Sequence, residues 1–314
     1  MILSVSRRTD IPAFYSDWFF DRVKDGYCFC ENPFFPNGKV AKIKIEPVRV
    51  TTNLLGGIEV TGNVDGIIFW TKDPRPMFAR LGELKEFKYY FHYTLTAYDE
   101  KIEPNVPSLV ERIKTFKELS NMTSPDQVIW RYDPILLSSE IDVAWHIKQF
   151  ENIAKQLCGH TKSCMVSFLI PGRRKDIFVP IKTQQDELLK NLARIARENG
   201  IQLHTCALEN RWKEYGIKTA KCTDPELFAK LNGGKVKTKR LDGQRKHCGC
   251  MPCVDIGVYN TCTHNCIYCY ANGFYAERGG SSDTNGARKS MLDKLDGEIY
   301  ERKTERLFDY GEGK

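Results

Sequence analysis

The sequence has no feature that would place the protein in a membrane or a secretory pathway. No stretch approaches 18 uncharged apolar residues, so the sequence predicts no membrane-spanning helix. The N-terminal segment, MILSVSRRTDIPAFY, contains no basic region followed by an apolar run and a small-residue cleavage site, which argues against a signal peptide. We therefore expect a cytoplasmic protein without a membrane partner, in which thiols stay reduced.

Two common nucleotide-binding motifs are also absent. The chain contains neither the phosphate-binding loop G-x-x-x-x-G-K-[ST] nor the dinucleotide fingerprint G-x-G-x-x-G. Their absence argues against an ATPase or a dinucleotide-dependent enzyme of familiar type. What remains is a chain of 314 residues, 41% apolar, with a net charge of +7. This length suits about two domains or one large barrel, and the composition suits folding in water.

Cysteine, by contrast, is present in an unusual amount and an uneven distribution. The 12 cysteines are too few for a disulfide scaffold and many for an ordinary enzyme. Half of them lie between Cys248 and Cys269, and the others are spread over the preceding part of the chain. In a reducing compartment, clustered thiols bind metal more often than they bind each other. The sequence therefore predicts a metal site in this segment.

Short apolar runs alternate with longer segments of helical period, which predicts βα units around a parallel sheet. Six strands are expected, at Ile2–Val5, Gly66–Trp70, Tyr89–Leu95, Val128–Tyr132, Ser163–Leu169 and Ile201–Cys206. Helices are expected at Phe14–Lys24, Pro76–Leu84, Ser108–Leu119, Asp142–Leu157, Gln184–Glu198 and Pro225–Leu231. The near-continuous hydrophobicity of the strands indicates that both faces of the sheet are covered. Alternation around Pro47 predicts an inserted pair of strands, at Val40–Ile45 and Glu46–Thr52.

Six βα units fit either a partial TIM-like (β/α)6 barrel or a doubly wound sheet. We expect the barrel to occupy residues 1–232 and a cysteine-rich iron–sulfur module to occupy 233–275. Residues 276–314 carry a charged helical pattern and are expected to be a surface helix or partly disordered. Both architectures place ligands at the carboxyl ends of the strands, where the sequence is polar and reactive.

The spacing of three cysteines carries the most specific chemical information. Cys262, Cys266 and Cys269 form a C-x₃-C-x₂-C triad. Three thiolates can hold three irons of a cubic [4Fe–4S] cluster, whereas a cluster that only carries electrons generally takes four. The missing ligand leaves one iron open, and an open metal position can bind a small molecule. A zinc ribbon, or another structural site built from two short cysteine knuckles, is the alternative.

With Tyr268 directly before its third cysteine, this triad resembles that of the radical S-adenosyl-L-methionine (SAM) superfamily. The resemblance implies that the triad holds a [4Fe–4S] cluster whose open iron chelates SAM. One electron, from a donor such as flavodoxin or ferredoxin, would cleave SAM to methionine and a 5′-deoxyadenosyl radical that abstracts hydrogen from a substrate. The superfamily fold is a partial (β/α)6 barrel, in agreement with the number of units expected from the sequence pattern.

One feature departs from that superfamily, because its triad usually follows the first strand and here follows all six. A fuller resemblance is to the family called domain of unknown function 1848, up to about Asn272. It is carried by four segments, SVSRRTDIP from Ser4, FWTKDP from Phe69, WRYDP from Trp130 and DIGVYNTC from Asp255. The triad and its flanks also resemble those of spore-photoproduct-lyase-type proteins.

Four further cysteines are candidates for a second [4Fe–4S] site, with Cys253 as an alternate: Cys206, Cys222, Cys248 and Cys250. Four thiolates would close a cluster with no open iron. The pair Cys250 and Cys253 also fits a zinc knuckle, and Cys206 and Cys222 remain candidates for simple packing residues.

The strand ends supply candidate cofactor contacts. Arg7, Arg8 and Asp10 follow the first strand, where guanidinium groups can bind a carboxylate bidentately, although a structural salt-bridge cluster is an equal alternative. Arg131 and Asp133 follow the fourth strand and are candidates for the carboxylate and ribose hydroxyls of SAM. Asp133 before Pro134 is also an ordinary opening of a turn.

A second class of function stays open at this point. The basic stretch Lys235–His247 can attract phosphates, and a non-catalytic zinc or iron–sulfur protein that binds nucleic acid is the alternative function. A solvated linker is the commoner explanation of such a stretch, so a nucleic-acid partner is not favoured.

Overall fold

The protein is an α/β structure organised by one large parallel sheet. The computed structural model describes residues 1–31, 40–52, 58–169, 177–206, 208, 211–231 and 248–272. The sheet has eight strands in the order β11-β10-β9-β8-β7-β6-β1-β12, and every neighbouring pair is parallel. Its strands are β1 (Ile2–Val5), β6 (Gly66–Thr71), β7 (Tyr89–Thr94), β8 (Val128–Ile135), β9 (Ser163–Phe168), β10 (Gln202–Thr205), β11 (Lys218–Thr219) and β12 (Cys253–Asp255).

The six strands expected from the sequence are all present, with bounds that differ by a few residues. The two additional strands are very short and lie at the two edges of the sheet. Strand β12 belongs to the cysteine-rich segment and pairs with β1, with Leu3 opposite Val254. Part of that segment is therefore a strand of the main sheet. In the described part of the chain the strand order is linear and β11 does not pair with β12.

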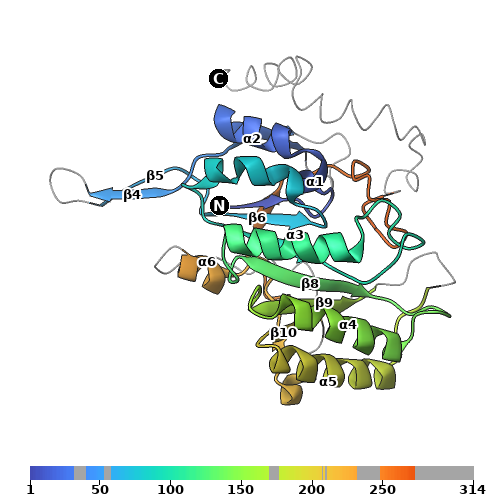
Figure 1. Cartoon of the computed structure of the whole chain (residues 1–314). Coiled ribbons are helices and arrows are strands. Elements are labelled where there is room, and N and C mark those ends of the chain that lie inside the picture. The colour runs from blue at the N-terminus through green and yellow to red at the C-terminus, as the bar shows by residue number, and fades with distance from the viewer. Residues whose placement is uncertain are drawn as a thin grey trace, which may run out of the picture.

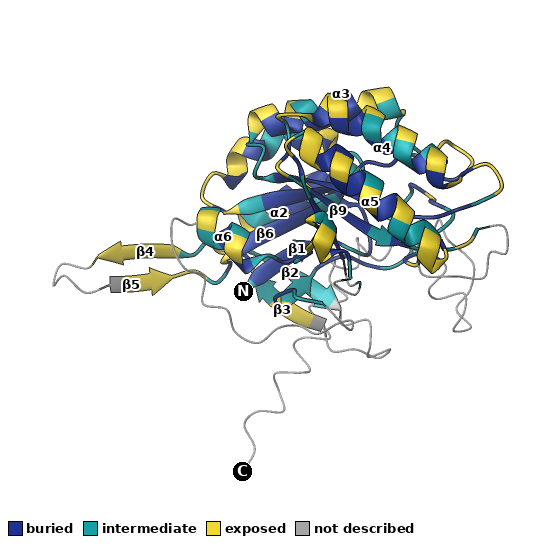
Figure 2. Cartoon of the chain, turned by 90° about the horizontal axis from the view of Figure 1, so that it is seen from below, coloured by how far each residue is buried: buried dark blue, intermediate teal, exposed yellow. Residues whose placement is uncertain are grey.

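The main helices lie along one side of the sheet, with α3, α4 and α5 next to one another (Figures 1 and 2). The helical elements are α1 (Ile11–Phe14), α2 (Ser16–Asp25), the 3-10 helix η1 (Arg75–Leu84), α3 (Leu109–Met122), α4 (Val143–Leu157), α5 (Lys182–Glu198), the 3-10 helix η2 (Lys213–Tyr215) and α6 (Pro225–Leu231). The first expected helix corresponds to α2, and the short helix α1 directly precedes it. Helix α3 begins with a capping box, in which Ser108 and Glu111 satisfy each other's backbone N–H groups. None of the described helices is long and apolar enough to cross a membrane.

Both faces of the sheet are buried, as the hydrophobic strands predict. On β6, Ile67 and Phe69 belong to the core under the main helices, whereas Ile68 belongs to a second core on the opposite face. Helix α6 and the segment around Cys250 cover this second face. We call this opposite face the inner face. It becomes polar toward the carboxyl ends of the strands, where the sequence pattern places ligands.

The insertion after α2 contains the two expected strands and two further ones. Strand β3 (Val40–Lys44) pairs with β2 (Tyr27–Glu31), and β4 (Arg49–Thr52) pairs with β5 (Ile58–Thr61). Both expected strands are therefore present, and each has a separate antiparallel partner. Figure 2 shows that the β4–β5 hairpin projects from the body with exposed residues along its described length. Exposed alternation indicated strands here, but it carried no information about their partners.

Close packing between α6 and the sheet gives a first testable prediction. A Cβ atom at Gly66 would lie 2.0 Å from the ring of Phe228, which is fully buried. We expect Gly66→Ala to lower the free energy of unfolding by about 1 to 3 kcal/mol, because neither the strand nor the ring can give way freely. Urea unfolding under anaerobic, reducing conditions measures the change.

Gly82→Ala is the matched control, since a Cβ atom at Gly82 meets no atom within 4 Å. If the two variants have the same unfolding midpoint, α6 does not pack on the sheet as described.

Candidate functional site

All the site residues expected from the sequence lie in the described part of the chain and gather around the carboxyl ends of the parallel strands. They form two neighbouring groups. One is the triad loop, residues 262–269, which lies beside the ends of β1, β6 and β7. The other is a set of thiols on the inner face near β8 and β10, which we call the four-thiol set: Cys206, Cys222, Cys248 and Cys250.

Asp255 is the last residue of β12, in the segment that leads into the triad loop, and it joins this segment to the end of β1. Its carboxylate accepts hydrogen bonds from the hydroxyl of Ser4 at 2.8 Å and from the backbone N–H of Arg7 at 2.8 Å. It also accepts from the hydroxyl of Ser6 and forms an ion pair with Arg8 at 3.2 Å. Burial alone would raise the pKa of Asp255, but Arg8 and these donors lower it. The carboxylate therefore stays charged and fixes β12 beside β1.

Close packing against Ser6 explains why a glycine, Gly257, stands two residues after Asp255. A Cβ atom there would lie 1.9 Å from the Oγ of Ser6, and the backbone N–H of Gly257 donates to Asp255 at 3.1 Å. Arg8 adds a second contact, from its Nη2 to the carbonyl of Asp255 at 2.6 Å. Arg8 is thus held in a buried salt-bridge cluster, which is the alternative that its sequence context left open.

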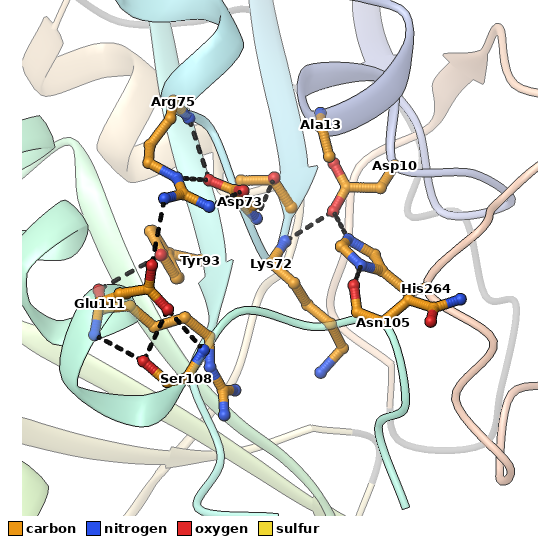
Figure 3. Close-up of polar contacts among 12 residues, drawn as sticks. Asp10, Ala13, Lys72, Asp73, Arg75, Tyr93, Asn105, Ser108, Glu111 and His264 are labelled. Atoms are coloured by element: carbon orange, nitrogen blue, oxygen red, sulfur yellow. Dashed lines mark hydrogen bonds and ion pairs between the residues drawn. The ribbon is translucent and has the colours of Figure 1, made fainter. Parts of the chain in front are cut away.

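The triad loop is anchored to the body through His264. Its Nε2 lies 2.8 Å from the carboxylate of Asp10, and its Nδ1 lies 3.1 Å from the carbonyl of Asn105 (Figure 3). Asp10 also accepts the backbone N–H of Lys72 at 2.7 Å and that of Ala13 at 3.0 Å. One carboxylate therefore ties the loop to α1 and to the end of β6. Asp10 therefore holds the triad loop in position.

Glu103, in the segment between β7 and α3, forms a second anchor. Its side chain is only 1% exposed and forms ion pairs with Lys72 at 2.8 Å and with Arg112 at 3.2 Å. It also accepts from the hydroxyl of Tyr268 at 2.6 Å and from that of Thr96 at 2.8 Å. Burial alone would raise the pKa of Glu103, but the charges of Lys72 and Arg112 lower it. The aromatic residue of the triad is therefore hydrogen-bonded to a buried carboxylate.

Removing the charge of Glu103 gives a second prediction. We expect Glu103→Gln to lower the free energy of unfolding by about 1.5 to 3 kcal/mol, because the buried cations lose a charged acceptor. Urea unfolding measures the loss.

Glu111→Gln is the control, since Glu111 pairs with Ser108 and Arg75 on the exposed start of α3 (Figure 3). Equal unfolding midpoints for the two variants would contradict the role of Glu103 as an anchor.

The triad thiols themselves lie within this network. Burial raises the pKa of the Cys262 thiol to about 12, against the lowering effect of the nearby backbone N–H groups of His264 and Asp10. Burial also raises the pKa of Cys266 to about 11, against the lowering effect of the nearby Lys72. Cys269 interacts electrostatically with both. Backbone N–H donors and a lysine are groups that stabilise thiolates once a metal removes their protons.

The four-thiol set is held more tightly. The sulfurs of Cys206 and Cys222 are 3.4 Å apart, and Cys250 accepts the backbone N–H of Cys222 at 3.1 Å. The Cys250 thiol also interacts electrostatically with the thiols of Cys222 and Cys248. Hydrogen bonds from Cys206 and Cys250 lower the pKa of Cys222 well below its ordinary value, and Arg131 adds to this effect. The structure thus brings together all four cysteines that the sequence proposed for a second site.

Arg131 and Arg7 lie beside these thiols on the inner face. Arg131 donates to the sulfur of Cys222 at 3.4 Å and forms an ion pair with Asp133. Arg7 contacts the sulfur of Cys253 at 3.6 Å. Both guanidinium groups lie over the ring of Trp70, at 4.8 Å for Arg7 and 5.2 Å for Arg131. Cys253, the alternate ligand, therefore faces Arg7.

Sequence reasoning missed the two carboxylates that organise the site. Asp255 stood in a motif already noted, but the strand that it ends has only three residues and shows no pattern. Glu103 lies in a loop with no periodicity, and nothing in the local sequence marks it. The basic stretch Lys235–His247 and the segment 276–314 lie outside the described residues.

The cysteines are free thiols throughout the described part of the chain. Within the same residues, no three His, Cys, Asp or Glu side chains are arranged around a point where they could hold a metal ion. Loading either group with metal would require side chains to turn toward a common centre.

Comparison with known proteins identifies one family. Neither a search of curated proteins nor a search of solved structures finds a match to this chain. A family model, described as domain of unknown function (DUF1848), matches residues 2–271. The match includes β1, Asp255, the triad and the four-thiol set, so the two groups of residues described above lie within one family domain. The chain belongs to the DUF1848 family.

Proposed function

We propose that this protein is a radical SAM enzyme in which Cys262, Cys266 and Cys269 hold a [4Fe–4S] cluster. The observation that carries the proposal is the triad itself, three cysteines on one loop anchored beside the carboxyl ends of parallel strands. A set of three cysteines leaves one iron of a cubic cluster without a protein ligand. The ends of parallel strands are where α/β proteins bind their ligands.

The surroundings of the triad fit such a cluster. Backbone N–H groups from two separate segments, at His264 and Asp10, lie near the Cys262 thiol and favour its thiolate form. Hydrogen bonds to ligating sulfur tune the potential of an iron–sulfur cluster. The loop is fixed by the two buried carboxylates of Asp10 and Glu103, so its thiols keep their positions without relying on the metal alone. When bound, a reduced cluster of this kind supplies the electron that cleaves SAM to methionine and a 5′-deoxyadenosyl radical.

The candidate SAM-binding residues fall into two groups. Arg7, Arg131 and Asp133 carry charged groups on the inner face, and we propose that they hold the carboxylate and the ribose of SAM. Arg8, Asp10 and Tyr268 are committed to Asp255, His264 and Glu103, respectively, and support the site by positioning the loop.

The sheet also fits the proposal. We propose that the strands from β1 to β10 form the wall of a partial (β/α)6 barrel and that residues 248–272 are the described part of an iron–sulfur module across its mouth. The polar carboxyl-terminal part of the inner face, with Trp70 and Arg131, would then line the substrate space. A cytoplasmic flavodoxin or ferredoxin would donate the electron.

The experiment that tests this function is a single-turnover assay on full-length protein. The protein is purified anaerobically, reconstituted with iron and sulfide, and incubated with SAM and dithionite. We expect 5′-deoxyadenosine and methionine to form only when SAM, reductant and cluster are all present. Absence of both products from protein that contains about four irons at the triad would overturn the proposal.

A further inference from the structure

We propose that the four-thiol set, Cys206, Cys222, Cys248 and Cys250, is a separate site for one thiophilic divalent ion, zinc above all. The proposal does not depend on the radical SAM function, because it stands on other cysteines and other contacts. It also differs from the second [4Fe–4S] cluster that the cysteine count suggested. The distinction between one ion and a cluster comes from how closely the sulfurs approach each other.

Sulfur contacts favour a single ion. Tetrahedral ligation with Zn–S bonds of about 2.3 Å sets the ligand sulfurs about 3.8 Å apart. The sulfurs of Cys206 and Cys222 are 3.4 Å apart, and the sulfur of Cys250 lies 3.1 Å from the backbone nitrogen of Cys222. In a cubic cluster each cysteine binds a different iron, so the cysteine sulfurs are spread around the cube and do not touch.

The backbone around the set is arranged as it is around bound thiolates. The sulfur of Cys250 accepts the backbone N–H group of Cys222 at 3.1 Å. The carbonyl of Cys222 is fixed from the other side, by the hydroxyl of Tyr90 at 2.8 Å and by the ring of His92 at 2.7 Å. Such outer contacts orient the groups that bind a metal and are part of a metal site. Simple packing of cysteine side chains needs none of them.

The local charge also matches a site with four thiolates. Four thiolates around a divalent ion carry a net charge of −2, which is costly to bury without cations nearby. The guanidinium group of Arg131 is buried and donates to the sulfur of Cys222 at 3.4 Å. Arg7 has electrostatic contact with Cys222 and Cys250 from the other side. The positive charges of Arg131 and Arg7 therefore offset part of the negative charge of such a site.

Three segments far apart in the chain would be joined by this ion. Cys206 follows β10, Cys222 lies between β11 and α6, and Cys248 and Cys250 lead into β12. Binding one ion would fasten the strand edge and the segment that crosses the inner face to each other. The site would thus hold the cover of the inner face in place, and its metal would contribute to folding directly.

Metal analysis of a variant without the triad tests the proposal. Cys262→Ala, Cys266→Ala and Cys269→Ala are combined, and the anaerobically purified protein is assayed for zinc, iron and sulfide without reconstitution. We expect about one zinc per chain and no sulfide. About four irons and four sulfides in this variant, or no bound metal at all, would overturn the proposal.

Single substitutions then test the ligands. Cys222→Ser in the same background should lose the zinc, whereas Cys158→Ser, at the exposed end of α4, should keep it. Cys253→Ser should also keep it, because Cys253 faces Arg7. Retention of zinc by Cys222→Ser, or its loss from Cys253→Ser with retention in Cys248→Ser, would contradict the assigned ligand set.

A further measurement leaves the four-thiol set intact and so avoids the case in which a ligand variant loses its metal by misfolding. Replacement of zinc by cobalt in the triad variant should give the intense visible bands of tetrahedral cobalt together with sulfur-to-cobalt charge transfer. Octahedral cobalt bands, or a Cys206–Cys222 disulfide found by mass mapping of the alkylated protein, would exclude the site.

Discussion

Replacement of Cys262, Cys266 and Cys269 together by alanine should remove about four irons per chain and abolish formation of 5′-deoxyadenosine. The reason is that the three thiolates are the only protein ligands of the proposed cluster, and no electron reaches SAM without it. Iron and sulfide analysis after reconstitution, followed by chromatography of the products, measures both effects. This is the largest change in activity that we expect from any substitution.

The control for this variant is Cys158→Ala, which removes an exposed thiol on α4 and should leave iron content and product formation unchanged. Circular dichroism shows whether the triple variant keeps its secondary structure. Formation of 5′-deoxyadenosine by a folded triple variant would show that the triad does not hold the reactive cluster.

Asp255→Ala should cause the largest loss of stability, about 3 to 5 kcal/mol in the free energy of unfolding. The change removes the carboxylate that accepts from the Ser4 and Ser6 hydroxyls and from the backbone N–H of Arg7. It also leaves the guanidinium group of Arg8 buried without its ion-pair partner. Because Asp255 holds β12 against β1, the triad loop should also lose its position. Urea unfolding measures the first effect, and iron content after reconstitution measures the second.

The pH dependence of this effect has a definite direction. The folded protein lowers the pKa of Asp255 below the unfolded value of about 3.9, so the stabilisation is fully present above that pH. It is lost as the pH falls through the lower, folded pKa. The difference between wild type and Asp255→Ala should therefore be constant near neutral pH and decrease in acid.

Glu86→Ala is the surface control for Asp255→Ala. Glu86 forms an exposed ion pair with Arg49, and its loss should change the free energy of unfolding by less than about 1 kcal/mol. A change for Asp255→Ala as small as that of the surface control would contradict the role assigned to Asp255.

The sequence predicted the sheet well because its strands are buried on both faces. Residues such as Ile67 and Ile68 pack into different cores, so the strand appears as a continuous apolar run. The edge strand β12 has only three residues, Cys253–Asp255, and is too short to show a pattern. The β4–β5 hairpin is exposed, and register on such a surface is set by partners that the local sequence does not specify.

Site residues could be predicted where their spacing along the chain indicates a chemistry. They could not be predicted where their role arises only from contacts made on folding. The triad and the four-thiol set follow from cysteine counts and intervals along the chain. Asp255 and Glu103 become important only because folding brings cations and hydroxyls from distant segments against them. The close approach of Cys206 to Cys222, which distinguishes one ion from a cluster, is likewise a property of the folded chain.

The central claim is that an iron held by the triad has an open position that binds SAM. Electron paramagnetic resonance of the anaerobically reduced, reconstituted protein tests it most directly. Addition of SAM should change the signal of the reduced cluster, because SAM becomes a ligand of the open iron. A reduced [4Fe–4S] signal that stays identical with and without SAM would contradict the account.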